Sequence, residues 1–315
     1  MARDPGCVPD ALIRLALCAG AGPAFLLDAL DAFGSWDAAV AASVDRWAAL
    51  PRVGVARARS VRAELDAVDA DDERRRMERA GARAIVVGDP DYPPALCGLP
   101  RMPPLLWCRG DPASAGDPAV AIVGARRATA YGIRQAGRFS QRLAEWGLPI
   151  ISGGARGIDA EAHRAALRAG GRTVAVLGSG LGQPYPQDHA ELFEAIVDAG
   201  GLLLSEFPVD MPPLAGNFPR RNRLVAGLAR TVLVVEAAAT SGALITARHA
   251  IDDHGRHPCA IPGPVDAARS RGCNEAIRDG WVHPVLDPVD VLPLVGLAPP
   301  ASDARPARDQ VQPMA

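Results

Sequence analysis

The pattern of hydrophobic and polar positions divides the chain into two regions. From Pro9 to about Leu65, short alanine-rich stretches of helical period are interrupted at "AGAGP", "FGS" and "LPRVG", and this spacing predicts a small bundle of helices. From residue 119 onward, short runs of aliphatic residues each precede a longer amphipathic stretch. The second region is therefore predicted to consist of β-α-β units.

Six apolar runs in the second region are the predicted strands. They cover residues 119–124, 149–152, 173–178, 202–205, 231–236 and 257–262. The amphipathic stretches between them predict helices at residues 131–147, 157–170, 187–199, 219–229 and 241–254. Strands and helices that alternate in this way form a parallel sheet with helices on both faces, which favours an open, extended Rossmann-like α/β fold over a closed eight-stranded barrel.

The segments outside these patterns set the predicted domain boundaries. The run "DADDERRRMER" at residues 69–79 mixes both signs of charge, which favours a solvated helix face over a basic patch. The proline-rich segment at residues 89–111 has no period and is expected to be an ordered, extended connector. The predicted organisation is a helical domain over residues 1–75, a connector and start of the core over 76–118, a Rossmann-like domain over 119–290 and a disordered tail over 291–315.

One turn of the predicted bundle has a candidate function. "LPRVGVARARSVRAEL" resembles a helix-hairpin-helix, in which a glycine-flanked turn offers backbone N–H groups to a phosphate. Arg52 stands where that motif usually has its first glycine. A bundle that only packs is the alternative, since one imperfect hairpin is weak evidence for DNA contact.

Composition and charge narrow the function classes. The 315 residues include 34 basic side chains, all of them arginine, so lysine-based Schiff-base chemistry is excluded. The net charge of −2 argues against a protein that coats nucleic acid without specificity. Residues 120–230, however, contain 13 arginines and 9 acidic residues, so this stretch carries +4 and the remainder −6.

Cysteine spacing and hydropathy address the compartment. The six cysteines form no CxxC pair, so neither a disulfide framework nor a zinc site is expected. The run "ALIRLALCAGAGPAFLLDAL" is interrupted by Arg14, Pro23 and Asp28, which is too broken for a membrane span and poorly shaped for a signal peptide. We therefore expect a cytoplasmic protein without membrane contact.

Four unusual loops follow predicted strands, at residues 124–132, 152–159, 178–186 and 236–247. Ligands of open parallel sheets bind at the carboxyl ends of strands. In "SGGARGID", Gly153 and Gly154 let the backbone approach a ligand, the following helix directs free N–H groups there, and Arg156 adds a positive charge. The loop is neither a Walker loop nor a dinucleotide fingerprint. A tight turn that uses glycine for geometry alone is the alternative.

Arginine and aromatic residues gather in the same loops. Arg126 and Arg127 end the first strand, and arginine forks recognise phosphate bidentately. Further candidates in "NFPRRNRLVAG" are Phe218, Arg220, Arg221, Asn222 and Arg223. Phe218 and Tyr185 offer flat faces for bases, and the hydroxyls of Ser241 and Thr246 are expected to cap a helix or donate to phosphate. The set suits a polyanionic strand better than one small nucleotide.

Metal and nucleophile chemistry are the competing interpretations. In a helix, Asp159 and His163 share a face while Glu161 points elsewhere, so a dipole-favoured acid with a packed histidine is the preferred interpretation over a metal site. Ser152, Ser179 and Ser241 lie in no G-x-S-x-G elbow. We expect no metal, no cofactor and no catalytic residue.

The motifs together resemble those of the DNA-processing protein A family (DprA, also called Smf). The resemblance rests on "AIVGARRATAYG", "SGGARGIDAEAHRAAL", "TVAVLGSGLGQPYP", "LLLSEFP", "FPRRNRLVAGLA", "VVEAAATSGALITARHA", "GRHPCAIPG" and "GCNEAIRDG", in the family's order over about residues 80–283. It implies an extended Rossmann-like homodimer that binds single-stranded DNA and loads the RecA recombinase in natural transformation, without catalysis. The N-terminal bundle matches the family's helical, SAM-like or hairpin-bearing leader in position and size.

The resemblance also implies roles for particular residues. Arg126 corresponds to the arginine of the first glycine loop, which contacts the DNA backbone. The segment with Phe218, Arg221, Asn222 and Arg223 faces the strand in the family, and residues 241–280 correspond to regions used for partner binding and dimer contacts.

The sequence departs from the family in three places. Ala125 replaces a small hydroxyl residue, Gln187 follows "YP" where a basic residue is common, and an apolar residue usually follows "SG" in the second glycine loop. Many members continue into a winged-helix domain, which we expect to be absent here.

Two other classes stay as alternatives, a small-nucleotide-binding Rossmann-like enzyme or sensor and a structural adaptor. The phosphoribohydrolase pattern "PGG-x-GT-x-x-E" does not occur, and the arginine-rich loops disfavour the adaptor.

Overall fold

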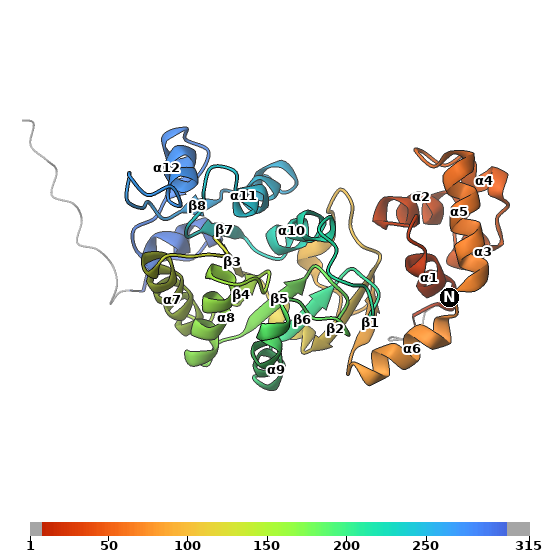
Figure 1. Cartoon of the computed structure of the whole chain (residues 1–315), viewed down its shortest axis with the longest axis horizontal. Helices are drawn as coiled ribbons and strands as arrows, with labels where there is room; N and C mark the ends of the chain where they lie inside the picture. The colour runs from red at the N-terminus through yellow and green to blue at the C-terminus, as the bar shows by residue number, and fades with distance from the viewer. Residues whose placement is uncertain (1–7, 301–315) are drawn as a thin grey trace, which may run out of the picture.

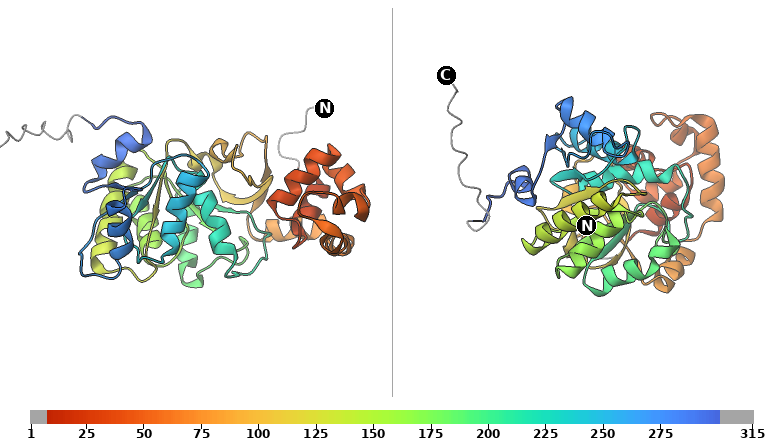
Figure 2. Two further views of the ribbon diagram at one scale, coloured as in Figure 1. Left: turned by 90° about the horizontal axis from the view of Figure 1, so that it is seen from above. Right: turned by 60° about the vertical axis from the view of Figure 1, so that its left-hand side comes forward.

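The structure, a computed structural model, describes residues 8–300 and shows a helical part at one end of an elongated α/β body (Figures 1 and 2). The helical part contains α1 (Asp10–Leu17), α2 (Pro23–Phe33), α3 (Trp36–Ala41), α4 (Val44–Ala48) and α5 (Gly54–Ala67). Trp47 is fully buried at its centre, packs edge-on against Phe25 at 5.9 Å between ring centroids and donates its indole N–H to Ala39 O at 2.8 Å. The predicted N-terminal helical region is confirmed.

The turn between α4 and α5 has the backbone of the helix-hairpin-helix motif at one informative position. Arg52 has φ of 61°, the left-handed conformation that glycine adopts without strain. Its side chain is 72% exposed and lies 3.6 Å from the Asp28 carboxylate. A phosphate contact by this turn stays the alternative to a bundle that only packs.

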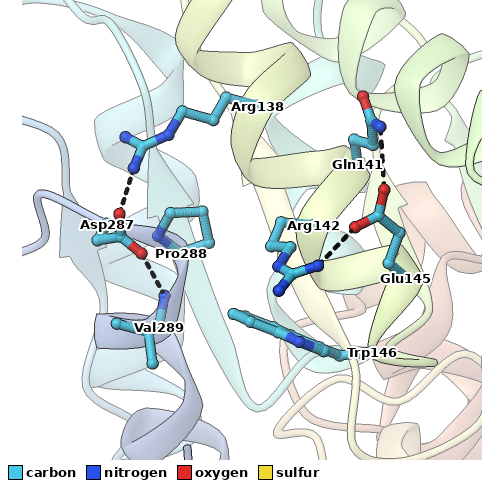
Figure 3. Close-up of a pocket in the computed structure, with 8 residues that line it drawn as sticks. All are labelled: Arg138, Gln141, Arg142, Glu145, Trp146, Asp287, Pro288 and Val289. Atoms are coloured by element: carbon cyan, nitrogen blue, oxygen red, sulfur yellow. Dashed lines mark hydrogen bonds and ion pairs between the residues drawn. The ribbon is translucent and has the colours of Figure 1, made fainter. Parts of the chain in front are cut away.

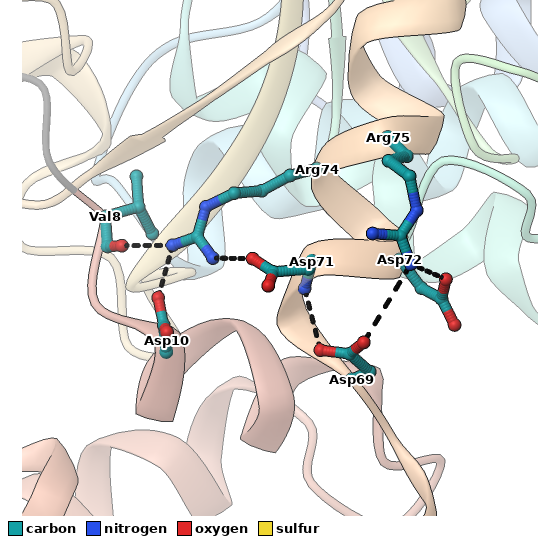
Figure 4. Close-up of polar contacts among 7 residues, drawn as sticks. All are labelled: Val8, Asp10, Asp69, Asp71, Asp72, Arg74 and Arg75. Atoms are coloured by element: carbon teal, nitrogen blue, oxygen red, sulfur yellow. Dashed lines mark hydrogen bonds and ion pairs between the residues drawn. The ribbon is translucent and has the colours of Figure 1, made fainter.

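Helix α6 (Ala70–Arg79) joins the helical part to the sheet. Its outer side carries ion pairs, among them Arg74 with Asp10 of α1 and with Asp71 (Figure 4). Its inner side buries Glu73, whose Oε1 accepts a hydrogen bond from Val209 N at 2.8 Å. The charged run was predicted to lie on a solvated helix face, and this holds for only one side of the helix. The helix also crosses the predicted domain boundary at residue 75.

The core is one nine-stranded sheet in the order β1-β2-β6-β5-β4-β3-β7-β8-β9. Neighbours from β6 to β9 are parallel, whereas β1 and β2 pair antiparallel with each other and β2 pairs antiparallel with β6. The strands are β1 (Arg83–Val86), β2 (Leu105–Gly110), β3 (Val120–Val123), β4 (Ile150–Ser152), β5 (Thr173–Leu177), β6 (Leu202–Ser205), β7 (Thr231–Val234), β8 (Cys259–Ala260) and β9 (His283–Pro284). The predicted Rossmann-like α/β fold is confirmed.

Helices cover both faces of this sheet (Figure 1). One face carries α7 (Ala130–Glu145), α8 (Ile158–Arg168) and α9 (Ala190–Asp198), and the other carries α10 (Asn217–Gly227), α11 (Gly242–Asp252) and α12 (Arg271–Arg278). Alternate residues of each strand point to opposite faces. In β3, Val120 and Ile122 therefore pack with Phe139 of α7, whereas Ala121 and Val123 pack with the α10–α12 layer.

Two predictions about irregular segments need correction. Residues 105–110, predicted as part of a connector, form β2, because their "LLWC" run is buried between β1 and β6. Residues 291–295, assigned to the tail, belong to a 3-10 helix (Pro288–Val295) with Val291 and Leu292 buried. Prolines in both segments interrupt the hydrophobic periodicity from which strands and helices were predicted. Residues 301–315 of the predicted tail lie outside the described residues.

Candidate nucleic-acid interface

The four unusual loops meet at the carboxyl ends of β3, β4, β5 and β7, as their positions predicted. They surround two adjoining hollows of about 430 and 180 Å³. Five residues line both hollows, namely Arg126, Gly153, Ala155, Phe218 and Arg221. The larger hollow continues over α11, where Ser241 and Thr246 line it, and the smaller one opens beside Arg127, Arg156 and Tyr185.

The glycine loop after β4 is occupied by an anion of the chain itself. Asp159, in the first turn of α8, accepts hydrogen bonds from Gly153 N at 3.2 Å and Ala155 N at 3.3 Å. Burial raises the pKa of this carboxyl, and Arg221 opposes that shift. The prediction of a turn suited to an anion holds, but the anion was expected to be an external ligand. Two of the N–H groups are therefore not free to bind a phosphate.

Arg221 lies beneath the same loop and is only 4% exposed. Its Nη1 donates to Gly153 O at 2.5 Å and also to Val176 O. Burial lowers the pKa of Arg221 to about 10, so the side chain remains cationic at neutral pH. A phosphate contact by Arg221 stays a prediction, while its observed hydrogen bonds tie the β4 loop to the end of β5.

The neighbouring residues of α10 point in different directions. Arg223 is buried in an ion pair with Glu206 and lines neither hollow. The exposed Arg220 guanidinium lies 5.1 Å from the ring centroid of Phe207, outside both hollows. Asn222 lines the larger hollow, where its Nδ2 donates to Gly242 O at 3.4 Å. Of these three predicted contacts, only Asn222 faces the hollows, because successive helical residues are about 100° apart.

Arg126, Phe218 and Tyr185 form a cluster beside the hollows, in which Arg126 lies over the Phe218 ring and the Tyr185 ring is tilted by 58° to that of Phe218. The Arg126 guanidinium lies 5.2 Å from the Phe218 ring centroid, and the Phe218 ring lies 5.7 Å from that of Tyr185. Arg126 and Arg127 are exposed, and no carboxylate within residues 8–300 forms an ion pair with either. Among residues 8–300, this edge therefore presents two cations without an ion-pair partner beside two aromatic rings.

Arg156 differs from these two arginines. It is half-exposed, but Asp188 holds its guanidinium with two hydrogen bonds, Nε to Oδ2 at 2.9 Å and Nη2 to Oδ1 at 3.0 Å. Sequence reasoning did not single out Asp188. The sequence feature that could have pointed to Asp188 is its position, three residues after Tyr185, whose ring was a candidate for contact with a base.

The helix after β7 supplies the predicted hydroxyls. Ser241 caps α11 by accepting from Ala243 N at 3.3 Å, and Thr246 donates to Gly242 O at 3.4 Å. Both side chains line the larger hollow. Ser241 is thus the N-cap of α11, whereas Thr246 bonds back to a carbonyl within the helix. A donation to phosphate by either hydroxyl stays a prediction.

The metal interpretation is not favoured by the geometry. Burial lowers the pKa of His163 to about 3, and its Nδ1 donates to Thr173 Oγ1 at 2.7 Å. Glu161 pairs instead with Arg168 at 2.6 Å. Within residues 8–300, no three His, Cys, Asp or Glu side chains are grouped so that they could hold a metal ion. In the same range, no helix has the length and apolar character needed to cross a bilayer.

A separate hollow of about 630 Å³ lies between the later turns of α7 and the 3-10 helix Pro288–Val295 (Figure 3). Arg138 is paired with Asp287, and the Arg142 guanidinium lies over the Trp146 ring and 3.0 Å from Glu145. The arginines that line this hollow are thus paired with carboxylates. We do not assign it to nucleic-acid binding.

Comparison with known proteins supplies the family. The model of the family described as DNA recombination-mediator protein A matches residues 83–296, which include all four loops. The chain belongs to this family. Protein Smf of Escherichia coli is 43% identical over 216 residues, covering 69% of this chain and 57% of that protein. Protein Smf of Synechocystis is 45% identical over 215 residues, covering 67% and 53%. The chain thus matches little more than half the length of these family members.

Solved structures of family members agree with the fold. DNA processing protein A of Streptococcus pneumoniae has a TM-score of 0.78 at 31% identity, covering 91% of this chain and 98% of that one. The Helicobacter pylori protein has a TM-score of 0.59 at 29% identity, covering 66% and 93%. The latter structure was solved to describe a single-stranded DNA binding mode of that protein.

Proposed function

We propose that this chain binds single-stranded DNA along the carboxyl edge of its parallel strands. The observation that carries the proposal is the cluster of Arg126, Phe218 and Tyr185 beside two hollows. Arg126 and Arg127 contact phosphates, because guanidinium groups form charge-assisted hydrogen bonds with phosphate oxygens. Phe218 and Tyr185 stack on bases, which every base permits since each has a π-face.

In this proposal the buried Asp159 and Arg221 support the surface from below, which replaces the sequence-based expectation that Arg221 contacts a phosphate. Asp159 and Arg221 fix the glycine loop from below, through Gly153 N and Gly153 O. Binding involves no chemical step. Arg220, exposed at the start of α10, adds a positive charge outside the hollows to those of Arg126 and Arg127.

The family description and the resemblance support a wider role. We propose that a homodimer of this chain mediates recombination by delivering the strand to the RecA recombinase in the cytoplasm during natural transformation. Residues 241–280 are the proposed region for partner and dimer contacts. The exposed Ile245, 45% accessible on α11, is an apolar residue available for such a contact.

Fluorescence anisotropy with labelled oligo-dT tests strand binding, with duplex DNA and ATP as competitors. We expect salt-sensitive binding, with a slope of about 0.7 log units per log unit of salt for each neutralised phosphate. Arg126→Ala should weaken binding by about 1.5–3 kcal/mol, the contribution of a hydrogen bond to a charged group. Arg164→Ala is the matched control, because Arg164 is exposed on α8 and lines neither hollow.

Two outcomes would overturn the proposal. Equal effects of Arg126→Ala and Arg164→Ala would remove the Arg126 loop from the interface. Competition by ATP at low concentration, together with weak oligo-dT binding, would favour the alternative of a small-nucleotide site in the hollow of about 180 Å³.

A further inference from the structure

Arg156 and Asp188 meet at the rim of the smaller hollow. Arg156 follows β4 and Asp188 follows β5, so two separate loops bring the side chains together. The guanidinium donates through both Nε and Nη2, at 2.9 and 3.0 Å, to the two carboxylate oxygens. The side chains are 54% and 55% exposed, so solvent and solutes reach the pair.

This pair has the geometry of the contact that a DNA phosphate would make. A guanidinium binds carboxylate and phosphate with the same planar fork of two parallel hydrogen bonds. The hydrogen bonds from Arg156 lower the pKa of Asp188, so its carboxylate is ionised at neutral pH. Asp188 thus occupies the Nε and Nη2 edge of the fork.

The other cations of the hollow are not paired in this way. Arg126 and Arg127 line the same hollow and form no ion pair with any carboxylate of residues 8–300. Four arginines line this hollow, and Arg221 is buried beneath it. Of the three exposed ones, Arg126, Arg127 and Arg156, only Arg156 forms an ion pair with a carboxylate of residues 8–300. The difference identifies Asp188 as the residue that removes one positive charge from this edge.

We propose that Asp188 sets the affinity of this site by competing with a DNA phosphate for the Arg156 fork. The inference rests on the proposed binding of single-stranded DNA at this edge. When the strand binds, Arg156 exchanges a carboxylate for a phosphate, so one exposed ion pair replaces another and the net gain is small. Without the Asp188 carboxylate the contact with phosphate would be an added ion pair, so Asp188 weakens binding by occupying the fork.

Asp188→Asn tests the proposal, since asparagine keeps the shape of the side chain and removes its charge. Asp117→Asn is the matched control. Asp117 holds Arg230 in the same fork, with Nε to Oδ1 at 2.7 Å, but at the amino ends of β3 and β7. Both variants raise the net charge by one, so the control measures the long-range effect of charge alone.

Anisotropy titrations of labelled oligo-dT over a series of NaCl concentrations provide the readout. Asp188→Asn should bind about threefold to tenfold more tightly than wild type at low salt, as expected for one additional charged hydrogen-bond fork at an exposed site. Its salt slope should steepen by about 0.7, the value for one more neutralised phosphate on a single strand. Asp117→Asn should change affinity less and leave the slope unchanged.

The double variant Arg156→Ala with Asp188→Asn identifies the route of the effect. If Asp188 acts by occupying the fork, then adding Asp188→Asn to the Arg156→Ala variant should change the affinity for oligo-dT no more than Asp117→Asn does. An undiminished gain in that background would overturn the proposal. So would an Asp188→Asn protein that binds no more tightly than Asp117→Asn. Weaker binding than wild type would show that Asp188 positions Arg156 for the strand instead.

The two proposals fail in different ways. If wild type does not bind oligo-dT at low salt, the proposed function is wrong. If wild type binds and Arg126→Ala weakens binding, but Asp188→Asn behaves as Asp117→Asn does, only the role of Asp188 is wrong. Thermal unfolding of each variant verifies that these exposed substitutions leave the fold intact.

Discussion

The Asp159 carboxylate accepts a hydrogen bond from Gly153 N at 3.2 Å, so the anion at the start of α8 is part of the chain. Arg221 balances this charge from below, with Nη1 on Gly153 O at 2.5 Å. The glycine loop is thereby held in one shape without a ligand. Binding energy from a DNA strand is then not needed to order the loop, which is the advantage of a preorganised site.

The first prediction concerns stacking by Phe218. Phe218→Ala should weaken binding to oligo-dT by about 1–3 kcal/mol, the cost of losing one base–aromatic contact. Phe218→Tyr should retain binding, whereas Phe218→Leu fills the space without a π-face and should weaken it. Because no charge changes, the salt slope measured by anisotropy should be the same in all three variants. A flattened slope would show that the substitution had displaced Arg126, whose guanidinium lies 5.2 Å from this ring.

The second prediction concerns Gly157, which links the first two glycine loops. It has φ of 79°, and a Cβ there would lie 2.3 Å from Ala125 O. Gly170 has φ of 68° with no atom within 4 Å of its would-be Cβ, so Gly170→Ala measures backbone strain alone. Gly157→Ala should lose about 1–3 kcal/mol more stability than Gly170→Ala, because of overpacking against Ala125 O and because its ψ of −121° lies outside the left-handed helical region that other residues can adopt. Urea unfolding compares the two, and equal losses would contradict the observed close packing.

The third prediction is a pH dependence of stability from His163. Burial lowers its pKa to about 3 in the folded protein, whereas the unfolded chain titrates near its ordinary value of 6.5. Between these values the unfolded state binds more protons, so the free energy of unfolding falls as the pH falls. The contribution is about 1.4 kcal/mol for each pH unit below 6.5.

His163→Gln removes this titration but leaves His254, whose pKa burial also lowers, to about 4. Urea unfolding at pH 7 and pH 5 should therefore show a smaller pH-dependent loss of stability in the variant than in wild type. The absolute stability of the variant does not enter this comparison. Parallel losses in the two proteins would mean that His163 becomes protonated without unfolding.

The fourth prediction concerns the link between the helical part and the core. Glu73 is fully buried, and its Oε1 accepts from Val209 N at 2.8 Å. Glu73→Ala leaves this buried N–H without an acceptor and should cost about 1–3 kcal/mol. Glu73→Gln keeps an acceptor oxygen and should cost less. Limited proteolysis should cleave near α6 faster in Glu73→Ala, and equal cleavage in both variants would argue against this hydrogen bond as the link.

The sequence predicted the regular part of the core well, because that information is local. The runs that became β3 to β8 are apolar and short, and the helices between them have one apolar face, so periodicity alone identified both. β1 and β2 were not predicted, because the information that makes them strands is not local. β2 lies in a proline-rich segment, and its strand character comes from its place between β1 and β6, of which β6 is far from it in the chain.

The candidate site was predicted as a location but not in its details. Glycine loops at strand ends indicated where the edge would be, and Arg126 and Phe218 do lie together there. Arg221 and Arg223 belong to the same motif, yet both are buried, one under the β4 loop and one against Glu206. Side chains of adjacent residues in a helix point in different directions, and only tertiary packing decides which of them face solvent.

By itself, the sequence determined the α/β class, the positions of the central strands along the chain, the helical N-terminal region and the edge at which the glycine loops gather. These follow from hydrophobic period and glycine placement, which act over a few residues. The tertiary structure decided which charges remain available. Asp159 meets Gly153 within one loop, but Arg156 meets Asp188, and Arg221 meets Val176, only because parallel strands bring separate loops to one edge. Whether an arginine is free, paired or buried depends on these long-range contacts, and residue type alone does not reveal it.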